Sequence, residues 1–117
     1  MDFHEEFSKS MAAFPCLLGL IFVDPQGESI LFEAQGMDQF DVKLAGAKMA
    51  ILMNAYQWVE AAASTQFIEL QYEDRFIFSI KLDRSYNITA IANDHTKKAR
   101  LKIHLRGMAE KFNSEIF

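Results

Sequence analysis

The feature that most constrains this chain is a long segment, residues 39–63, that contains no proline and is rich in alanine, leucine and methionine. These residue types favour helix, so the sequence predicts one long helix here. Its apolar side chains form two opposite stripes. The first stripe contains Phe40, Leu44, Ala47, Ile51, Ala55 and Trp58. The second stripe contains Val42, Ala45, Met49, Leu52, Met53 and Tyr56. A helix that lies on a sheet needs only one apolar face, so a second stripe requires a separate cover.

Two arrangements would provide that cover. The long helix is either sandwiched inside one chain, between a sheet and an outer helix, or packed against a second copy of itself. We expect the first and last helices to share the opposite face of the sheet, which leaves the long helix alone. Exposing three or four large apolar side chains would forfeit roughly 1.5–3 kcal/mol each, and such a patch normally marks a partner surface. The sequence therefore favours a two-fold dimer with antiparallel helices, and the second stripe supplies the predicted seam: Met49, Leu52, Met53 and Tyr56.

The remaining elements follow from hydrophobic periodicity. Phe3, Phe7, Met11 and Phe14 recur at helical spacing, which predicts an amphipathic helix that Pro15 ends. Residues 17–24 and 28–34 read as a β-hairpin around an Asp-Pro-Gln-Gly turn. Residues 66–72, 75–82 and 86–92 alternate or are β-branched, which predicts three more strands before a last helix. The order α-β-β-α-β-β-β-α predicts a single α+β domain over residues 1–117, a five-stranded antiparallel sheet with helices on both faces.

Composition and charge exclude several classes of protein. The chain has 117 residues, half of them hydrophobic, which suits one domain with a substantial core. Its net charge of −4 argues against a general grip on nucleic acid. The longest uncharged stretch, residues 10–23, is shorter than the ~20 apolar residues of a membrane span. An acidic start does not fit a signal peptide, and the single Cys16 has no disulfide partner within the chain. We therefore expect a soluble, cytoplasmic protein.

No catalytic or cofactor-binding motif emerges from the residues. The glycines are too scattered to form a phosphate-binding loop. Asp94 and His95 lack a second pair of ligands at metal spacing, so we expect them to be solvated at a strand-to-helix turn. Cys16 precedes an apolar strand and reads as an inert buried thiol. The sequence therefore predicts a protein that is not an enzyme and uses no metal or cofactor. A small enzyme built on Cys16 or on the Asp94–His95 pair is the competing interpretation.

Charge is distributed unevenly along the chain. The first 42 residues hold eight acidic residues and one basic residue, Lys9. Between residues 95 and 111 the chain is basic apart from Glu110, through Lys97, Lys98, Arg100, Lys102, Arg106 and Lys111. One interpretation is a solvated outer face of the last helix, turned toward the acidic first helix. The other is a docking surface for an acidic protein or an anionic membrane.

Residues 14–27, which read Phe-Pro-Cys-Leu-Leu-Gly-Leu-Ile-Phe-Val-Asp-Pro-Gln-Gly, resemble the opening of Roadblock/LC7 domains. Those domains begin with a helix, a proline near its end, a strand with an internal glycine, and an Asp-x-x-Gly hairpin. The order of elements from Phe3 to Phe112 also matches, and residues 67–73 and 76–80 resemble the paired third and fourth strands. Two departures are Cys16, where the family often has glycine, and residues 94–98, where it often has Leu-Gly.

The resemblance implies a homodimeric scaffold whose two sheets join edge to edge and whose central helices pack together. Members bind Ras-like small GTPases and regulate nucleotide state or polarity, or serve as light chains on motor complexes. Such a regulator works by repositioning switch residues of the GTPase itself. The predicted sheet edge contains Ile68, Leu70 and Tyr72. The predicted partner contacts are Lys43, Lys48, Gln57 and Glu60.

Three alternatives stay open at this point. In the first, the chain pairs with a different Roadblock-like chain in place of a second copy of itself. In the second, it is a light-chain-type scaffold of a motor complex. In the third, it is a PAS-like sensor of a small molecule, which requires a cavity with convergent polar groups. A PAS-like order places several short helices between the second and third strands, whereas this sequence predicts one long helix there.

Overall fold

The computed structural model describes the backbone of residues 1–59 and 66–117, and the side chains of those ranges except residues 56–59. The helices are α1 (Phe3–Ala13), α2 (Gln39–Val59) and α3 (Lys98–Ile116). The strands are β1 (Leu17–Val23), β2 (Ser29–Ala34), β3 (Phe67–Gln71), β4 (Phe76–Lys81) and β5 (Asn87–Ala92). Two short 3₁₀ turns, η1 (Asp83–Ser85) and η2 (His95–Lys97), flank β5. The predicted element order and the α+β class are confirmed; the end of the predicted long helix, residues 60–63, lies outside the described residues.

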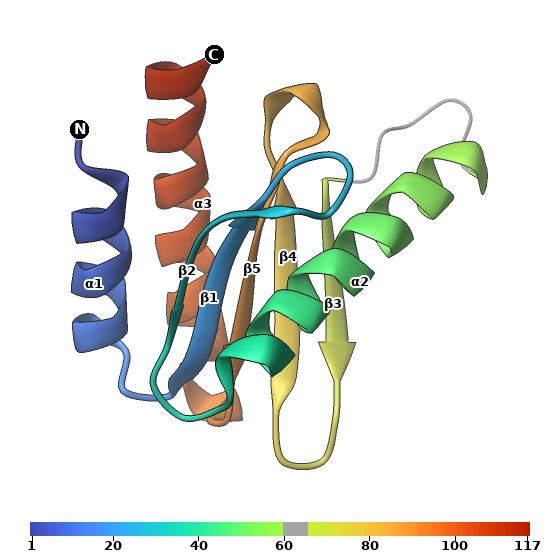
Figure 1. Cartoon of the computed structure of the whole chain (residues 1–117). Coiled ribbons are helices and arrows are strands. Elements are labelled where there is room, and N and C mark those ends of the chain that lie inside the picture. The colour runs from blue at the N-terminus through green and yellow to red at the C-terminus, as the bar shows by residue number, and fades with distance from the viewer. Residues whose placement is uncertain (60–65) are drawn as a thin grey trace.

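The five strands form one antiparallel sheet in the order β2-β1-β5-β4-β3. Figure 1 shows α2 crossing one face of this sheet, with α1 and α3 side by side on the other face. β2 and β3 are the two edges, so α2 carries the chain from one edge to the other. This layout leaves the outward side of α2 without a covering element from the described part of the chain.

The thicker core layer lies between the sheet and the α1–α3 pair, and phenylalanine dominates it. The Phe112 ring on α3 lies 4.7 Å from that of Phe3, 5.9 Å from that of Phe7 and 5.4 Å from that of Phe22, measured between centroids. Two of these contacts are edge-on and one is stacked, the geometries that aromatic pairs prefer. Phe112 therefore joins α1, β1 and α3 in a single cluster.

The second core layer is thinner because α2 approaches β1 closely. A Cβ atom on Gly46 would lie 2.9 Å from Cγ2 of Ile21, and one on Gly19 would lie 2.5 Å from Cγ2 of Val42. The two glycines, one on each element, remove the atoms that would otherwise hold the helix and strand apart. The side of α2 that carries Gly46 and Val42 is therefore the side that faces the sheet.

The two edges of the sheet differ. At the β2 edge, Phe22 of β1 pairs with Leu31 of β2, and the next residue, Val23, pairs with Ser29. Ile30 is therefore an extra residue in β2 and forms a β-bulge. Helix α1 also contacts this edge through Glu33, whose carboxylate accepts from Ser8 Oγ at 2.9 Å. The pairing of β3 with β4 is regular over Phe67–Gln71 and contains no bulge. Because bulges and covering elements protect an edge from pairing, β3 is the more available edge.

Candidate interaction surface

The outward side of α2 is apolar and exposed. Phe40 is 68% exposed, Leu44 is 40% exposed and Ile51 is 66% exposed. We call these three side chains the outer stripe. Single exposed apolar residues are ordinary, but three large ones on the same helix face are not, and exposed apolar groupings of this kind mark interaction sites.

The prediction that Met49 and Met53 face outward is wrong. Met49 is 1% exposed and Met53 is 3% exposed, and both lie on the same side of α2 as the buried Val42. The reason is Gly46, which lets this side of the helix pack closely on Ile21 of β1. The candidate seam on α2 is therefore the first stripe. The side chain of Tyr56, also predicted for the seam, lies outside the described residues.

Leu52 lies on the flank of α2 that faces β3. The other flank faces β2, because Lys43 Nζ lies 4.6 Å from the centre of the Phe32 ring and Asn54 Nδ2 donates to the Pro25 carbonyl at 3.2 Å. Leu52 follows Lys43 by nine positions, which is about two and a half helical turns, so it lies on the opposite side of the helix. Leu52 is half-buried and continues the outer stripe toward the β3 edge.

The predicted edge residues Ile68 and Leu70 lie on the α2 side of β3. Their neighbour Glu69 contacts α3, and successive side chains of a strand point to opposite faces. Both are half-buried, and Tyr72 is exposed just beyond the end of the strand. The structure thus brings together an apolar surface from two elements. We call it the α2–β3 surface: Phe40, Leu44, Ile51, Leu52, Ile68 and Leu70.

The predicted partner contacts are placed only in part. Lys48 is exposed on α2, and Lys43 is exposed beside the Phe32 ring of β2. They belong to different flanks of the helix, so they border the outer stripe on its two sides. The side chains of Gln57 and Glu60 lie outside the described residues.

On its other face, β3 is held by α3. Lys98 Nζ lies 2.8 Å from Glu69 Oε2, Lys102 Nζ also contacts Glu69, and Gln71 Nε2 donates to the same carboxylate at 2.6 Å. Burial raises the pKa of Glu69, but these hydrogen bonds outweigh it and lower the pKa to about 2. Lys98 also lies over the ring of Phe76, at 5.1 Å. The ion pairs of Glu69 with Lys98 and Lys102 therefore hold β3, the more available edge strand, against α3.

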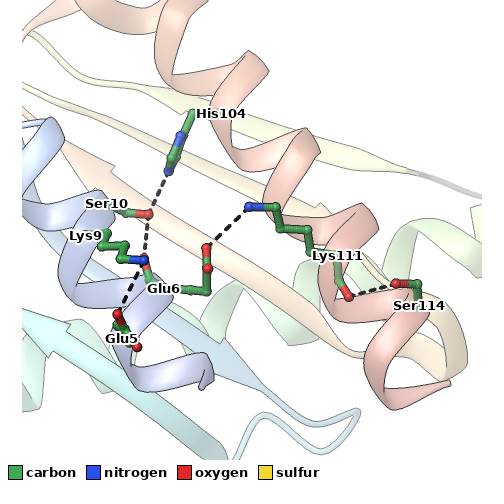
Figure 2. A network of polar contacts seen from close by, with 7 residues as sticks. All are labelled: Glu5, Glu6, Lys9, Ser10, His104, Lys111 and Ser114. Atoms are coloured by element: carbon green, nitrogen blue, oxygen red, sulfur yellow. Dashed lines mark hydrogen bonds and ion pairs between the residues drawn. The ribbon is translucent and has the colours of Figure 1, made fainter. Parts of the chain in front are cut away.

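A second polar network joins α1 to α3 (Figure 2). Ser10 Oγ lies 2.7 Å from His104 Nε2 and also donates to the Glu6 carbonyl at 2.9 Å. Because a hydroxyl has only one hydrogen to donate, this arrangement makes His104 Nε2 the donor to Ser10. Lys111 Nζ lies 3.6 Å from the Glu6 carboxylate. Burial, followed by the charge of Lys111, lowers the pKa of His104 against an opposing effect of Glu6.

This network predicts a loss of stability at mildly acidic pH. The pKa of His104 is lower in the folded chain than its ordinary value of about 6.5, so the unfolded chain binds more protons just below that value. We therefore expect the thermal midpoint to fall as the pH decreases from about 7 to about 5. The His104→Gln variant is expected to show a smaller fall, which thermal unfolding followed by circular dichroism would measure. An identical pH dependence in both proteins would contradict this assignment.

The residues considered for catalysis have other roles. The Asp94 carboxylate caps η2, where it accepts from Thr96 N at 2.9 Å and from Thr96 Oγ1 at 2.6 Å. Burial, followed by the charge of Asp94, raises the pKa of the Cys16 thiol, which disfavours a nucleophilic thiolate. Cys16 is half-buried and lines a cavity of about 280 Å³ between the end of α1 and the start of α3. Among the described residues, no group of three or more His, Cys, Asp or Glu is placed to hold a metal ion.

Comparison with known proteins defines the class of fold. The chain superposes on the crystal structure of a Roadblock/LC7 domain from Streptomyces avermitilis with a TM-score of 0.84 at 10% identity, covering 99% of this chain and 98% of that one. A structure described as MglB with tetrameric arrangement gives 0.82 at 11% identity, covering 94% and 84%. Profilin IA from Acanthamoeba castellanii gives 0.67 at 9% identity, covering 99% and 100%. The fold is therefore that of Roadblock/LC7 domains, with a profilin-like arrangement of sheet and helices.

Sequence comparison adds nothing to this structural result, since no protein-family model and no curated protein sequence matches the chain. Across the described residues, the structure contains no helix long and apolar enough to cross a membrane.

Proposed function

We propose that this chain is a non-enzymatic, homodimeric interaction module that binds a Ras-like small GTPase and regulates its nucleotide state. The observation that carries the proposal is the α2–β3 surface, an uncovered apolar helix face beside the more available sheet edge, on a Roadblock/LC7 fold. We place the protein in the cytoplasm, where a lone thiol such as Cys16 stays reduced.

The dimer is proposed to form through two contacts at once. The two α2 helices pack antiparallel across a two-fold axis through Phe40, Leu44 and Ile51, and the two β3 edges pair into one continuous sheet. Fully burying each large apolar side chain is worth roughly 1.5–3 kcal/mol, and both copies contribute. This gain offsets the loss of translational and rotational freedom on association.

Regulation of a GTPase by such a dimer needs no catalytic residue from the regulator. A dimer that binds one conformation of the switch segments more tightly than another shifts the GTPase toward that conformation. Lys43 and Lys48 border the outer stripe and are the proposed polar contacts, together with Gln57 and Glu60. Although the net charge of the chain is −4, Lys43 and Lys48 are local positive charges that can pair with carboxylates of the partner.

Capture of the partner tests the function. The immobilised chain is incubated with lysate of its source organism in GDP or in a non-hydrolysable GTP analogue. We expect a small GTPase to be retained more strongly in one nucleotide state. The purified GTPase should then bind the Lys48→Glu variant about tenfold more weakly, because charge reversal at an interface rim introduces repulsion.

Lys9→Glu is the matched control, since Lys9 is an exposed lysine on α1. This variant should bind the GTPase like the unmodified chain. Recovery of no small GTPase in either nucleotide state would contradict the proposed function.

A further inference from the structure

We propose that the exposed face of α3 is a second docking surface, which binds an acidic amphipathic helix of a protein partner. The surface consists of Ala99, Arg100, Ile103, Arg106 and Gly107, and we call it the α3 patch. It lies on the opposite side of the sheet from the α2–β3 surface (Figure 1). The inference goes beyond the proposed function and does not depend on it.

The α3 patch combines an apolar centre with two flanking cations. Ile103 is 69% exposed, the most exposed large apolar side chain on this helix. Arg100 precedes it by three positions and Arg106 follows it by three, and each step of three shifts a side chain about 60° around a helix. The two guanidinium groups therefore lie on either side of Ile103, where they can bracket an apolar row of a partner helix.

The neighbours of Ile103 along the helix allow a close approach. Ala99 and Gly107 lie one turn before and one turn after it, and both are exposed. A Cβ atom on Gly107 would meet nothing within 4 Å, so the space above this residue is open. A helix backbone laid across the patch would contact Ile103 without meeting a bulky side chain at either neighbouring turn.

The cations of the patch are distinct from those that the fold uses. Lys98 and Lys102 pair with Glu69, and Lys111 pairs with Glu6. Within the described part of the chain, neither arginine of the patch forms an ion pair. Arg106 lies over the ring of Phe67 at 5.2 Å, which leaves its guanidinium edge free to donate hydrogen bonds.

The chemistry of the patch favours carboxylates on a protein over a membrane or a nucleic acid. Arginine binds carboxylate through paired hydrogen bonds, and Glu69 and Glu6 already show carboxylates docking on the flanks of this helix. A cation near an anionic membrane is worth only about 1 kcal/mol, and two with a single apolar side chain give weak anchoring. Glu110, exposed near the patch, would also oppose a phosphate-rich surface but suits a basic residue of a protein partner.

A designed peptide of about 20 residues provides the probe, long enough to span the patch as a helix. It carries a leucine and alanine face flanked on both sides by glutamate. We expect it to bind the full chain with amide shift changes centred on residues 99–107, and to bind more weakly as salt increases. A peptide with every glutamate replaced by glutamine should bind about tenfold more weakly. No binding, equal binding of both peptides, or stronger binding to phosphatidylserine vesicles would overturn the proposal.

Variants locate the site independently of folding. Arg100→Gln, Arg106→Gln and Ile103→Asp should each weaken peptide binding about tenfold, whereas Lys9→Gln on α1 should leave it unchanged. All five residues of the patch are exposed, so circular dichroism should show a native fold in each variant. Ile51→Asp, which addresses the proposed dimer, should leave peptide binding intact. Loss of binding in Lys9→Gln, or retention in all three patch variants, would contradict the assignment.

Discussion

Replacement of Ile51 by aspartate is expected to convert a dimer of this chain into a folded monomer. Ile51 is the last residue of the outer stripe along α2, and its exposed side chain makes little contact within its own chain. In the proposed dimer, an aspartate there would be buried against the apolar stripe of the partner helix and lose its hydration, which costs several kcal/mol for an unpaired charge. Light scattering should give twice the chain mass of 13.4 kDa for the unmodified protein and the chain mass for the variant.

Ile103→Asp is the matched control for this experiment. Ile103 is as exposed as Ile51 and also lies within a helix, so the cost of placing aspartate in a helix is the same. This variant should remain dimeric. A dimer that survives Ile51→Asp would show that α2 is not the seam. An unmodified chain that is monomeric at micromolar concentration would contradict self-association and favour pairing with a different Roadblock-like chain.

Removal of the Phe112 ring is expected to cause the largest loss of folding stability. Phe112 is fully buried and contacts three other phenylalanine rings from α1 and β1. Phe112→Ala should cost about 3–5 kcal/mol, from lost burial and from the cavity left between rings that cannot close in. A small domain has about 5–15 kcal/mol of stability in total, so the variant should unfold at a much lower urea concentration.

Ile30→Ala provides the comparison for this stability measurement. Ile30 is an exposed residue of the β2 bulge and belongs to neither proposed surface, so its truncation should change stability by less than about 0.5 kcal/mol. A loss below about 1 kcal/mol in Phe112→Ala would mean that the aromatic cluster does not organise the α1–α3 layer.

The fold was predictable because its periodicities are clear. Phe7 and Met11 recur at helical spacing and are buried, and Phe76, Phe78 and Ile80 recur at every second position of β4 and are buried together on one face of the sheet. Asp24 and Gly27 also form the predicted turn: Gly27 has a φ of 86°, and its N–H donates to the Asp24 carbonyl at 2.9 Å. These signals are local, so the sequence alone contains them.

The orientation of α2 was not predictable from periodicity. Both stripes are apolar, and hydrophobicity does not distinguish a stripe that faces a sheet from one that faces a partner. The distinguishing signal is Gly46, a glycine in the interior of a helix, where it costs stability unless a close approach requires it. Its position beside Val42 and Met49 pointed to the sheet-facing side.

The residues that form ion pairs with the basic side chains of α3 were also not predictable from the sequence. Lys98 and Lys102 meet Glu69, about 30 residues earlier in the chain, because the sheet order places β3 and β4 beneath α3. Of the two interpretations of the basic helix, the one that turns it toward the acidic first helix fits the Lys111–Glu6 pair alone. Pairing across such sequence distances depends on the order of strands, which hydrophobic patterns do not specify.

The difference between the two sheet edges also sets a limit on assembly. A sheet with two open edges can pair with another chain at each edge and grow into a fibre. A sheet with a single open edge can pair with only one other chain, because that pairing leaves no open edge for a third. In this chain the β2 edge is bulged at Ile30 and held by α1 through Glu33. If two chains pair through β3 as proposed, the edges that remain are the two β2 strands, and the bulge at Ile30 disfavours further pairing there.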